Sequence, residues 1–204
     1  MRFLPLVFLA GALASALTAD TVVYDNLSES SAGADGVGFV GPLFDSFTSG
    51  PAGPLTGLQL MLSGDDTSSG TLDVGLFADS STSPGQLMAA LGTIRDSALS
   101  ETPATYNISL TATPLLTTGT LYWIGLYGTT TGEWSYDYDD SGIGVANDYF
   151  ANQLGVFSNI NDPYQMSVTT EGASTVPEPA SFLLVAAGLG FVTLLRRAAT
   201  RRTA

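Results

Sequence analysis

Short segments in which hydrophobic and polar residues alternate recur along the chain, and they constrain its fold more than any other feature. In residues 71–77, Leu72, Val74 and Leu76 alternate with polar or small residues. A period of two places these three side chains on one face of a β-strand. Because stretches rich in Gly, Ser, Thr, Asp and Pro separate such segments, the pattern predicts an all-β fold, a single jelly-roll-like β-sandwich.

The most strand-like segment is 120–127, which is rich in aromatic and aliphatic residues. Segment 86–99 is ambiguous, because its first half contains good helix formers whereas Gly92, Thr93 and Ile94 favour a strand. We expect a strand there, since every neighbouring segment is one. The expected strands are 21–26, 37–48 with an interruption at Gly41-Pro42, 58–62, 71–77, 86–99, 105–110, 120–127, 133–138 and 165–170.

Residues 1–19 have the pattern of a secretory signal peptide. Met1-Arg2 is followed by an apolar run to Leu13 and then by small residues, which is the order of a basic region, a hydrophobic region and a cleavage site. Cleavage after Ala16 satisfies the small-x-small pattern better than cleavage after Ala19. We therefore expect an exported body over residues 20–175, the length of one domain.

The last segment, 176–204, combines a proline-flanked motif, an uncharged apolar run over 180–195 and a basic tail. As a helix the apolar run is ~24 Å long, somewhat short of the ~30 Å hydrocarbon core of a bilayer. It predicts a C-terminal transmembrane helix that anchors the chain, with arginines on the cytoplasmic side; a buried core helix is disfavoured because so few of its positions are polar. The motif consists of Pro177, Glu178 and Pro179, and the membrane stop consists of Arg196, Arg197, Arg201 and Arg202.

This order of motif, apolar helix and arginine cluster over residues 176–202 resembles the PEP-CTERM sorting signal of Gram-negative bacteria. The resemblance implies recognition by an exosortase, a membrane transpeptidase, with processing near Pro177-Glu178-Pro179. It also implies export alongside extracellular polysaccharide. The expected location is the membrane first, then the cell surface or the extracellular space.

Parts of the body are similar to exported domains of the choice-of-anchor R type. The similarity is carried by 76–79 with 83–85, by 121–126 and by 163–168. It implies an extracellular, β-rich domain, and it brings no catalytic motif that maps onto numbered positions of this chain.

The body is strongly acidic. Between residues 20 and 175 it has 18 acidic residues and one basic residue, Arg95, so its formal charge is −17. Such a surface repels nucleic acid and anionic lipid, and it favours cations and tolerates neutral sugars. We therefore expect no nucleic-acid partner, whereas extracellular polysaccharide is a candidate partner.

The chain has no histidine, cysteine or lysine. These absences exclude Ser-His-Asp triads, thiol nucleophiles, the usual zinc sites and Schiff-base lysines. Carboxylates remain, as in glycoside hydrolysis. We expect no enzyme; the rival is a carboxylate-based glycan-processing enzyme, in which Glu133 beside Trp134 acts with Asp137 or Asp139.

Residues 137–148 resemble a calcium-binding EF-hand loop, since oxygen-bearing side chains occupy positions 1, 3, 5 and 12 and Gly142 occupies position 6. Position 12 is an aspartate instead of the longer glutamate, and no flanking helices are expected. The alternative is an acidic surface loop. The candidate calcium ligands are Asp137, Asp139, Ser141 and Asp148, and the sequence suggests no other cofactor.

Trp134, Tyr136 and Tyr138 share one face of the expected strand 133–138. If that face is exposed, they form a stacking platform for a glycan; the alternative is packing in the core. Together these patterns predict an exported structural or adhesive component of a polysaccharide-rich matrix. The alternatives are the glycan-processing enzyme and a carbohydrate-binding module.

Overall fold

The computed structural model describes residues 19–64 and 69–172. The predicted signal peptide, the sorting motif, the apolar run 180–195 and the arginine tail lie outside the described residues. Residues 19–173 make one compact unit. Its two antiparallel sheets confirm the predicted all-β sandwich, whereas the jelly-roll subtype stays a prediction.

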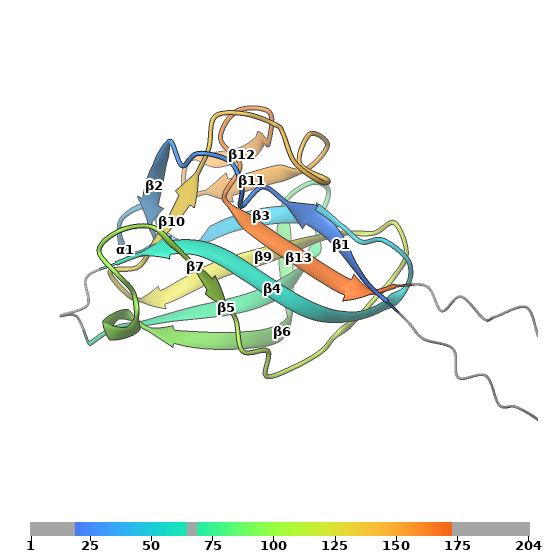
Figure 1. The fold of residues 1–204 in the computed structure, drawn as a ribbon, viewed down its shortest axis with the longest axis horizontal. Helices are drawn as coiled ribbons and strands as arrows, with labels where there is room; N and C mark the ends of the chain where they lie inside the picture. The colour runs from blue at the N-terminus through green and yellow to red at the C-terminus, as the bar shows by residue number, and fades with distance from the viewer. Residues whose placement is uncertain (1–18, 65–68, 173–204) are drawn as a thin grey trace, which may run out of the picture. The chain divides into compact units, whose positions relative to one another are not determined.

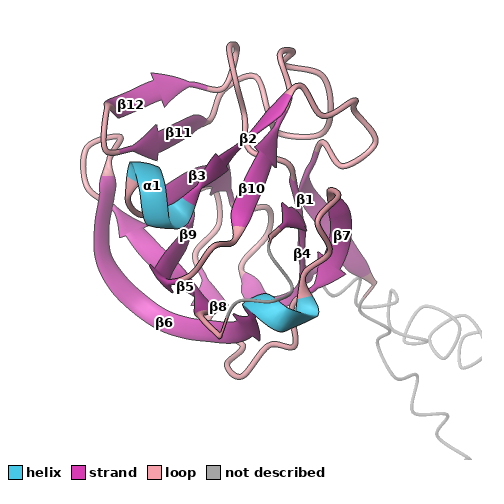
Figure 2. Ribbon diagram, turned by 90° about the vertical axis from the view of Figure 1, so that its left-hand side faces the viewer, coloured by secondary structure: helices cyan, strands magenta, loops and turns pink. Residues whose placement is uncertain are grey.

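The first sheet has the strand order β1-β13-β4-β10-β2, with the short β7 and β8 also paired to β4. Figures 1 and 2 show β2 and β10 rising away from the long β4. The strands of this sheet are β1 (Asp20–Asp25), β2 (Gly33–Gly36), β4 (Gly53–Ser63), β7 (Ala104–Asn107), β8 (Leu115–Leu116), β10 (Glu133–Tyr136) and β13 (Met166–Glu171).

The second sheet has the order β12-β11-β3-β9-β5-β6. A single helical turn, α1 (Val37–Val40), precedes it, and a 3-10 turn, η1 (Asp96–Ala98), follows its last edge strand. Its strands are β3 (Leu43–Thr48), β5 (Thr71–Asp79), β6 (Pro84–Arg95), β9 (Leu121–Thr129), β11 (Tyr149–Asn152) and β12 (Gly155–Ser158).

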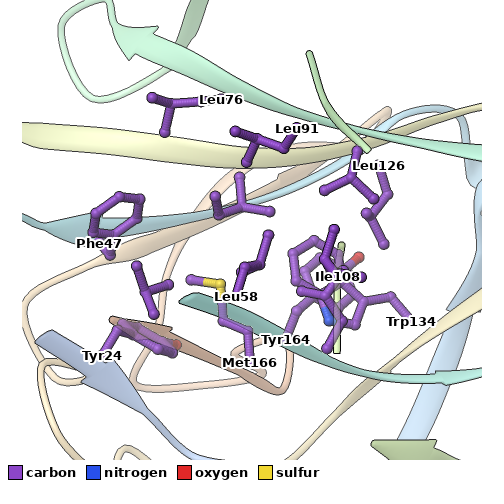
Figure 3. Packing of buried hydrophobic residues seen from close by; sticks show 14 of the residues in the cluster. Tyr24, Phe47, Leu58, Leu76, Leu91, Ile108, Leu126, Trp134, Tyr164 and Met166 are labelled. Atoms are coloured by element: carbon purple, nitrogen blue, oxygen red, sulfur yellow. The ribbon is translucent and has the colours of Figure 1, made fainter. Parts of the chain in front are cut away.

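The core lies between the two sheets. Leu72, Val74 and Leu76 of β5 are fully buried, as their alternation predicts. They face a layer from the first sheet that includes Leu60 and Val168. Figure 3 shows Leu58, Met166 and Tyr24 on one side of this core and Leu76, Leu91 and Leu126 on the other.

The structure corrects the expected strand 37–48. Residues Val37–Val40 form α1, and the strand begins only at Leu43. Gly41, with φ +78°, is in a backbone conformation that other residues rarely adopt, and Pro42 follows it. This pair ends the turn and redirects the chain, so the strand has a separate start.

Four short strands were not predicted: β2, β8, β11 and β12. β2 has the sequence Gly-Ala-Asp-Gly, which contains no alternating apolar residues, and it forms because it pairs with β10. The hairpin of β11 and β12 is closed by a two-residue turn, with Asn152 paired to Gly155. These strands depend on tertiary pairing instead of on local pattern.

Candidate functional site

A pocket lies where the edges of the two sheets meet. Its walls come from β2, the edge strand of the first sheet, from β10, and from the β11–β12 hairpin at the edge of the second. Figure 2 shows these four strands together at the upper end of the sandwich. The pocket is lined by Asp35, Tyr136, Phe150, Asn152, Leu154, Phe157 and Asp162.

The pocket has a volume of about 210 Å³. Pockets for drug-sized ligands have roughly 300–1,000 Å³, so this one suits a single monosaccharide unit or a ligand of similar size. Its lining combines three aromatic rings with two carboxylates and one amide. That combination offers apolar faces and directional hydrogen-bonding groups within one small space.

The hairpin supplies the aromatic wall. Phe150 of β11 and Phe157 of β12 pair across the hairpin, and their rings stack with centroids 5.1 Å apart. Asn152 holds the turn, because its Oδ1 accepts a hydrogen bond of 2.9 Å from the backbone N–H of Leu154. Phe150 is buried whereas Phe157 is 38% exposed, so Phe157 presents a ring to a ligand.

Tyr136 lines the pocket from β10. Its strand partner is Gly33, where an added Cβ would lie 2.4 Å from the Tyr136 hydroxyl oxygen. A residue larger than glycine at position 33 would therefore displace the tyrosine side chain. The ring of Tyr138 lies 5.9 Å from that of Tyr136, measured between centroids, but Tyr138 does not line the pocket.

Asp35 is positioned by the interior. Its Oδ2 accepts a hydrogen bond of 2.6 Å from the Tyr164 hydroxyl and a longer one of 3.5 Å from the Asn152 amide. Tyr164 is itself buried and stacks on Trp134 at a centroid distance of 4.8 Å. The core thus fixes the orientation of the Asp35 carboxylate.

Asp162 stands in the loop before β13. Partial burial raises the pKa of its carboxyl, and the nearby negative charge of Asp35 raises it further. Within residues 19–64 and 69–172, no donor forms a hydrogen bond or ion pair with this carboxylate. Asp162 is therefore available to bond a group from outside the chain.

Trp134, Tyr136 and Tyr138 do not form a set of three exposed rings, and for Trp134 the alternative of core packing holds. Trp134 is fully buried, and its indole N–H donates to the backbone oxygen of Gln165 at 2.9 Å. β10 ends at Tyr136, so Tyr138 lies beyond the strand and is 68% exposed. Trp134 belongs to the core because its face of β10 turns inward, and only Tyr136 of the three lines the pocket.

The predicted calcium ligands are not brought together. Asp148 accepts hydrogen bonds from the backbone N–H and the hydroxyl of Thr48, at 3.1 and 3.0 Å. Asp137 instead accepts from the Asn26 amide at 3.1 Å. Between them, Ile143 forms an isolated antiparallel β-bridge with Asp25 of β1.

Asp139 and Ser141 remain close, since the Asp139 carboxylate accepts from the Ser141 backbone N–H at 2.8 Å. Hydrogen bonds from Ser141 lower the pKa of Asp139. In the part of the chain that the structure describes, no group of three or more acidic side chains is placed to hold a metal ion. Calcium binding by this loop stays a prediction without an assembled site.

The predicted acid pair around Glu133 is not assembled either. Glu133 is exposed at the start of β10 and accepts a hydrogen bond from the Ser63 hydroxyl at 3.2 Å. Asp137 follows the end of the same strand, ~13 Å farther along at the usual rise per residue. Alternation along β10 places the Glu133 side chain on the face opposite to Trp134, away from the indole.

Of the pocket residues, sequence reasoning named Tyr136 and missed Asp35, Phe150, Asn152, Leu154, Phe157 and Asp162. Four of these six lie in the unpredicted strands β2, β11 and β12, whereas Leu154 and Asp162 lie outside the strands. The aromatic residues at 149–150 and 157, on either side of a possible turn, were the one local sign of this hairpin.

Comparison with models of known protein families finds no match, and comparison with curated proteins finds no similar chain. Among residues 19–64 and 69–172, no helix has the length and apolar character needed to cross a bilayer. The sorting and choice-of-anchor resemblances stay predictions from the sequence.

Proposed function

We propose that this chain is an exported module of the cell surface or extracellular matrix, which adheres to polysaccharide and performs no catalysis. The observation that carries the proposal is the pocket between β2, β10 and the β11–β12 hairpin. A sugar has apolar ring faces and polar edges. Tyr136 and Phe157 match the first, and Asp35, Asn152 and Asp162 match the second.

Delivery is the second part of the proposal. The pattern of residues 1–19 supports export, and the motif Pro177-Glu178-Pro179 with Arg196 and Arg197 supports sorting by an exosortase. The apolar run 180–195 would hold the chain in the membrane until processing. A module anchored in this way meets the polysaccharide that is exported beside it.

The proposed absence of catalysis rests on Glu133 and Asp35, whereas Asp162, whose carboxyl has a raised pKa, is included in the enzyme test below. Glu133, the acid favoured by the sequence, is exposed and distant from Asp137. A catalytic acid is usually buried beside apolar groups, which raise its pKa. Asp35 is instead held by the neutral donors Tyr164 and Asn152, an arrangement suited to binding.

The test compares the wild-type chain with Glu178→Ala in the native host. We expect wild type to lose the mass of the residues beyond the motif and to co-purify with extracellular polysaccharide. Glu178→Ala should keep Arg201 and Arg202 in its mature mass and remain with the membrane fraction. Mass spectrometry and fractionation measure both outcomes.

Wild type that keeps its tail would contradict sorting, and wild type released free of polysaccharide would contradict adhesion. The enzyme alternative is tested on the same polysaccharide with the purified body, residues 19–173, which has its own core. We expect no release of reducing ends. Release that Glu133→Gln or Asp162→Asn abolishes would replace adhesion with catalysis.

A further inference from the structure

The pocket contains negative charge without a basic partner. Asp35 and Asp162 both line it, and Arg95 is the sole basic residue between positions 20 and 175. Arg95 ends β6, which is one edge of the second sheet, whereas the pocket is built on β11 and β12 at the other edge. The arginine is therefore separated from the pocket by the width of the sheet.

The donors that reach these carboxylates are neutral. Asp35 accepts from a tyrosine hydroxyl and an amide, and Asp162 has no donor within the described part of the chain. Partial burial and the charge of Asp35 together raise the pKa of Asp162. A ligand with a positive charge would relieve the repulsion, whereas a neutral ligand would leave it and an acidic ligand would add to it.

The aromatic wall restricts which cation fits. The faces of Tyr136 and Phe157 attract both a cation and the C–H face of a sugar ring. Calcium takes six to eight oxygen ligands, and no acidic cluster of the described residues is placed to hold a metal. A bare metal ion would also leave the aromatic wall unused.

We propose that the pocket binds an amino sugar with a free ammonium group, as one unit of a partly deacetylated polysaccharide. This rests on the proposed adhesion to polysaccharide and names its ligand class. The ammonium group lies against Asp35 and Asp162, the ring packs on Tyr136 and Phe157, and the Asn152 amide meets a hydroxyl. The charge of −17 on the body attracts such a cationic polymer from a distance.

The test is calorimetric titration of the purified body with a glucosamine tetramer and with its fully N-acetylated counterpart, at pH 6. The two probes differ in charge and share the sugar ring. We expect the glucosamine tetramer to bind at least tenfold more tightly. Asp162→Asn, which keeps the shape and removes the charge, should weaken that binding at least fivefold and leave the acetylated probe unaffected.

The matched control is Asp20→Asn, which removes one charge from an exposed position at the start of β1, outside the pocket. It should leave the affinity within twofold. Equal losses in Asp20→Asn and Asp162→Asn would overturn the inference, because the attraction would then belong to the whole acidic surface. Spermidine, a flexible polyamine, tests the ring; binding as tight as that of the tetramer would also overturn it.

Two further outcomes separate this inference from the proposed function. Tighter binding of the acetylated tetramer would overturn the amino-sugar class and keep glycan adhesion. No binding of either tetramer, with the chain still co-purifying with polysaccharide in the host, would overturn this pocket as the amino-sugar site. Adhesion would stand in both cases.

Discussion

The interior carboxylates of Asp45, Asp137 and Asp148 and the pocket carboxylates of Asp35 and Asp162 have different environments. Asp45 is completely buried on β3, and its oxygens accept hydrogen bonds from the Asn159 amide at 2.9 Å and from the Tyr164 backbone N–H at 2.6 Å. Asp162, in the pocket, is only partly buried and has no bonding partner within the described residues. The interior carboxylate is enclosed by the fold, whereas the pocket carboxylate is left open.

Tyr164 connects the two sets. Its backbone N–H donates to Asp45, and its hydroxyl donates to Asp35 at the pocket wall. Burial first, and then the hydrogen bond to Asp35, raise the pKa of the Tyr164 hydroxyl, so it stays protonated as a donor. Tyr164 therefore holds the buried carboxylate of Asp45 and also orients the pocket carboxylate of Asp35. The same residue serves a structural acid and a binding acid.

The largest expected effect is the loss of folding stability in the variant Asp45→Ala. The change leaves two buried donors, the Asn159 amide and the Tyr164 N–H, without an acceptor, at about 1–3 kcal/mol each. We expect the free energy of unfolding to fall by about 2–6 kcal/mol, measured by urea denaturation. Asp162→Ala is the control from the pocket and should change it by no more than about 0.5 kcal/mol. Equal losses would break the distinction between the two sets.

The second prediction uses pH. Burial raises the pKa of Asp148 to about 7 and that of Asp137 to about 6, above the ~3.9 of an unfolded aspartate. The folded state therefore binds more protons than the unfolded state between pH ~4 and 7. The free energy of unfolding should therefore rise as the pH falls from 8 to 5. This added stability should disappear when the pH is raised through the two folded pKa values.

Each pKa unit corresponds to about 1.4 kcal/mol, so a gain of at least about 1 kcal/mol between pH 8 and 5 is expected from urea midpoints. Asp148→Asn should reduce the gain because it removes one of the titrating groups, whereas Asp162→Asn should reduce it less. Stability that increases steadily from pH 5 to 8 would show that these interior carboxylates are already favourably ionised.

The smallest expected effect is that of calcium on the loop 137–148. Screening of the −17 body by salt should stabilise the fold. Since the four predicted ligands are not assembled, calcium should shift the melting temperature by less than about 1 °C relative to a sodium salt of equal ionic strength; 1 kcal/mol corresponds to roughly 2–4 °C at this size. A larger shift that Asp139→Asn removes would restore the loop as a calcium site.

Much of the sandwich is readable from local pattern. The alternation of Leu72, Val74 and Leu76 predicts β5 and its buried face, and 120–127 predicts β9. Each of these strands lies between two others in the second sheet, so the burial of one face appears in the sequence as alternating apolar residues. β2 does not, because this edge strand, Gly33–Gly36, gains its stability from backbone pairing to β10 and needs no apolar residues. β11 lies between β12 and β3, but its four residues are too few to show a pattern.

The sequence alone determined which chemical groups are present: carboxylates, amides and aromatic rings on an acidic body, without histidine, cysteine or lysine. It could not determine which of them meet. Trp134 and Tyr136 look equivalent in the strand pattern, yet the first packs on Tyr164 in the core and the second faces the pocket. Asp35 and Asp162 are far apart in sequence and share one wall only because two sheet edges converge. Pairing between distant strands decided that site, and no local pattern encodes such pairing.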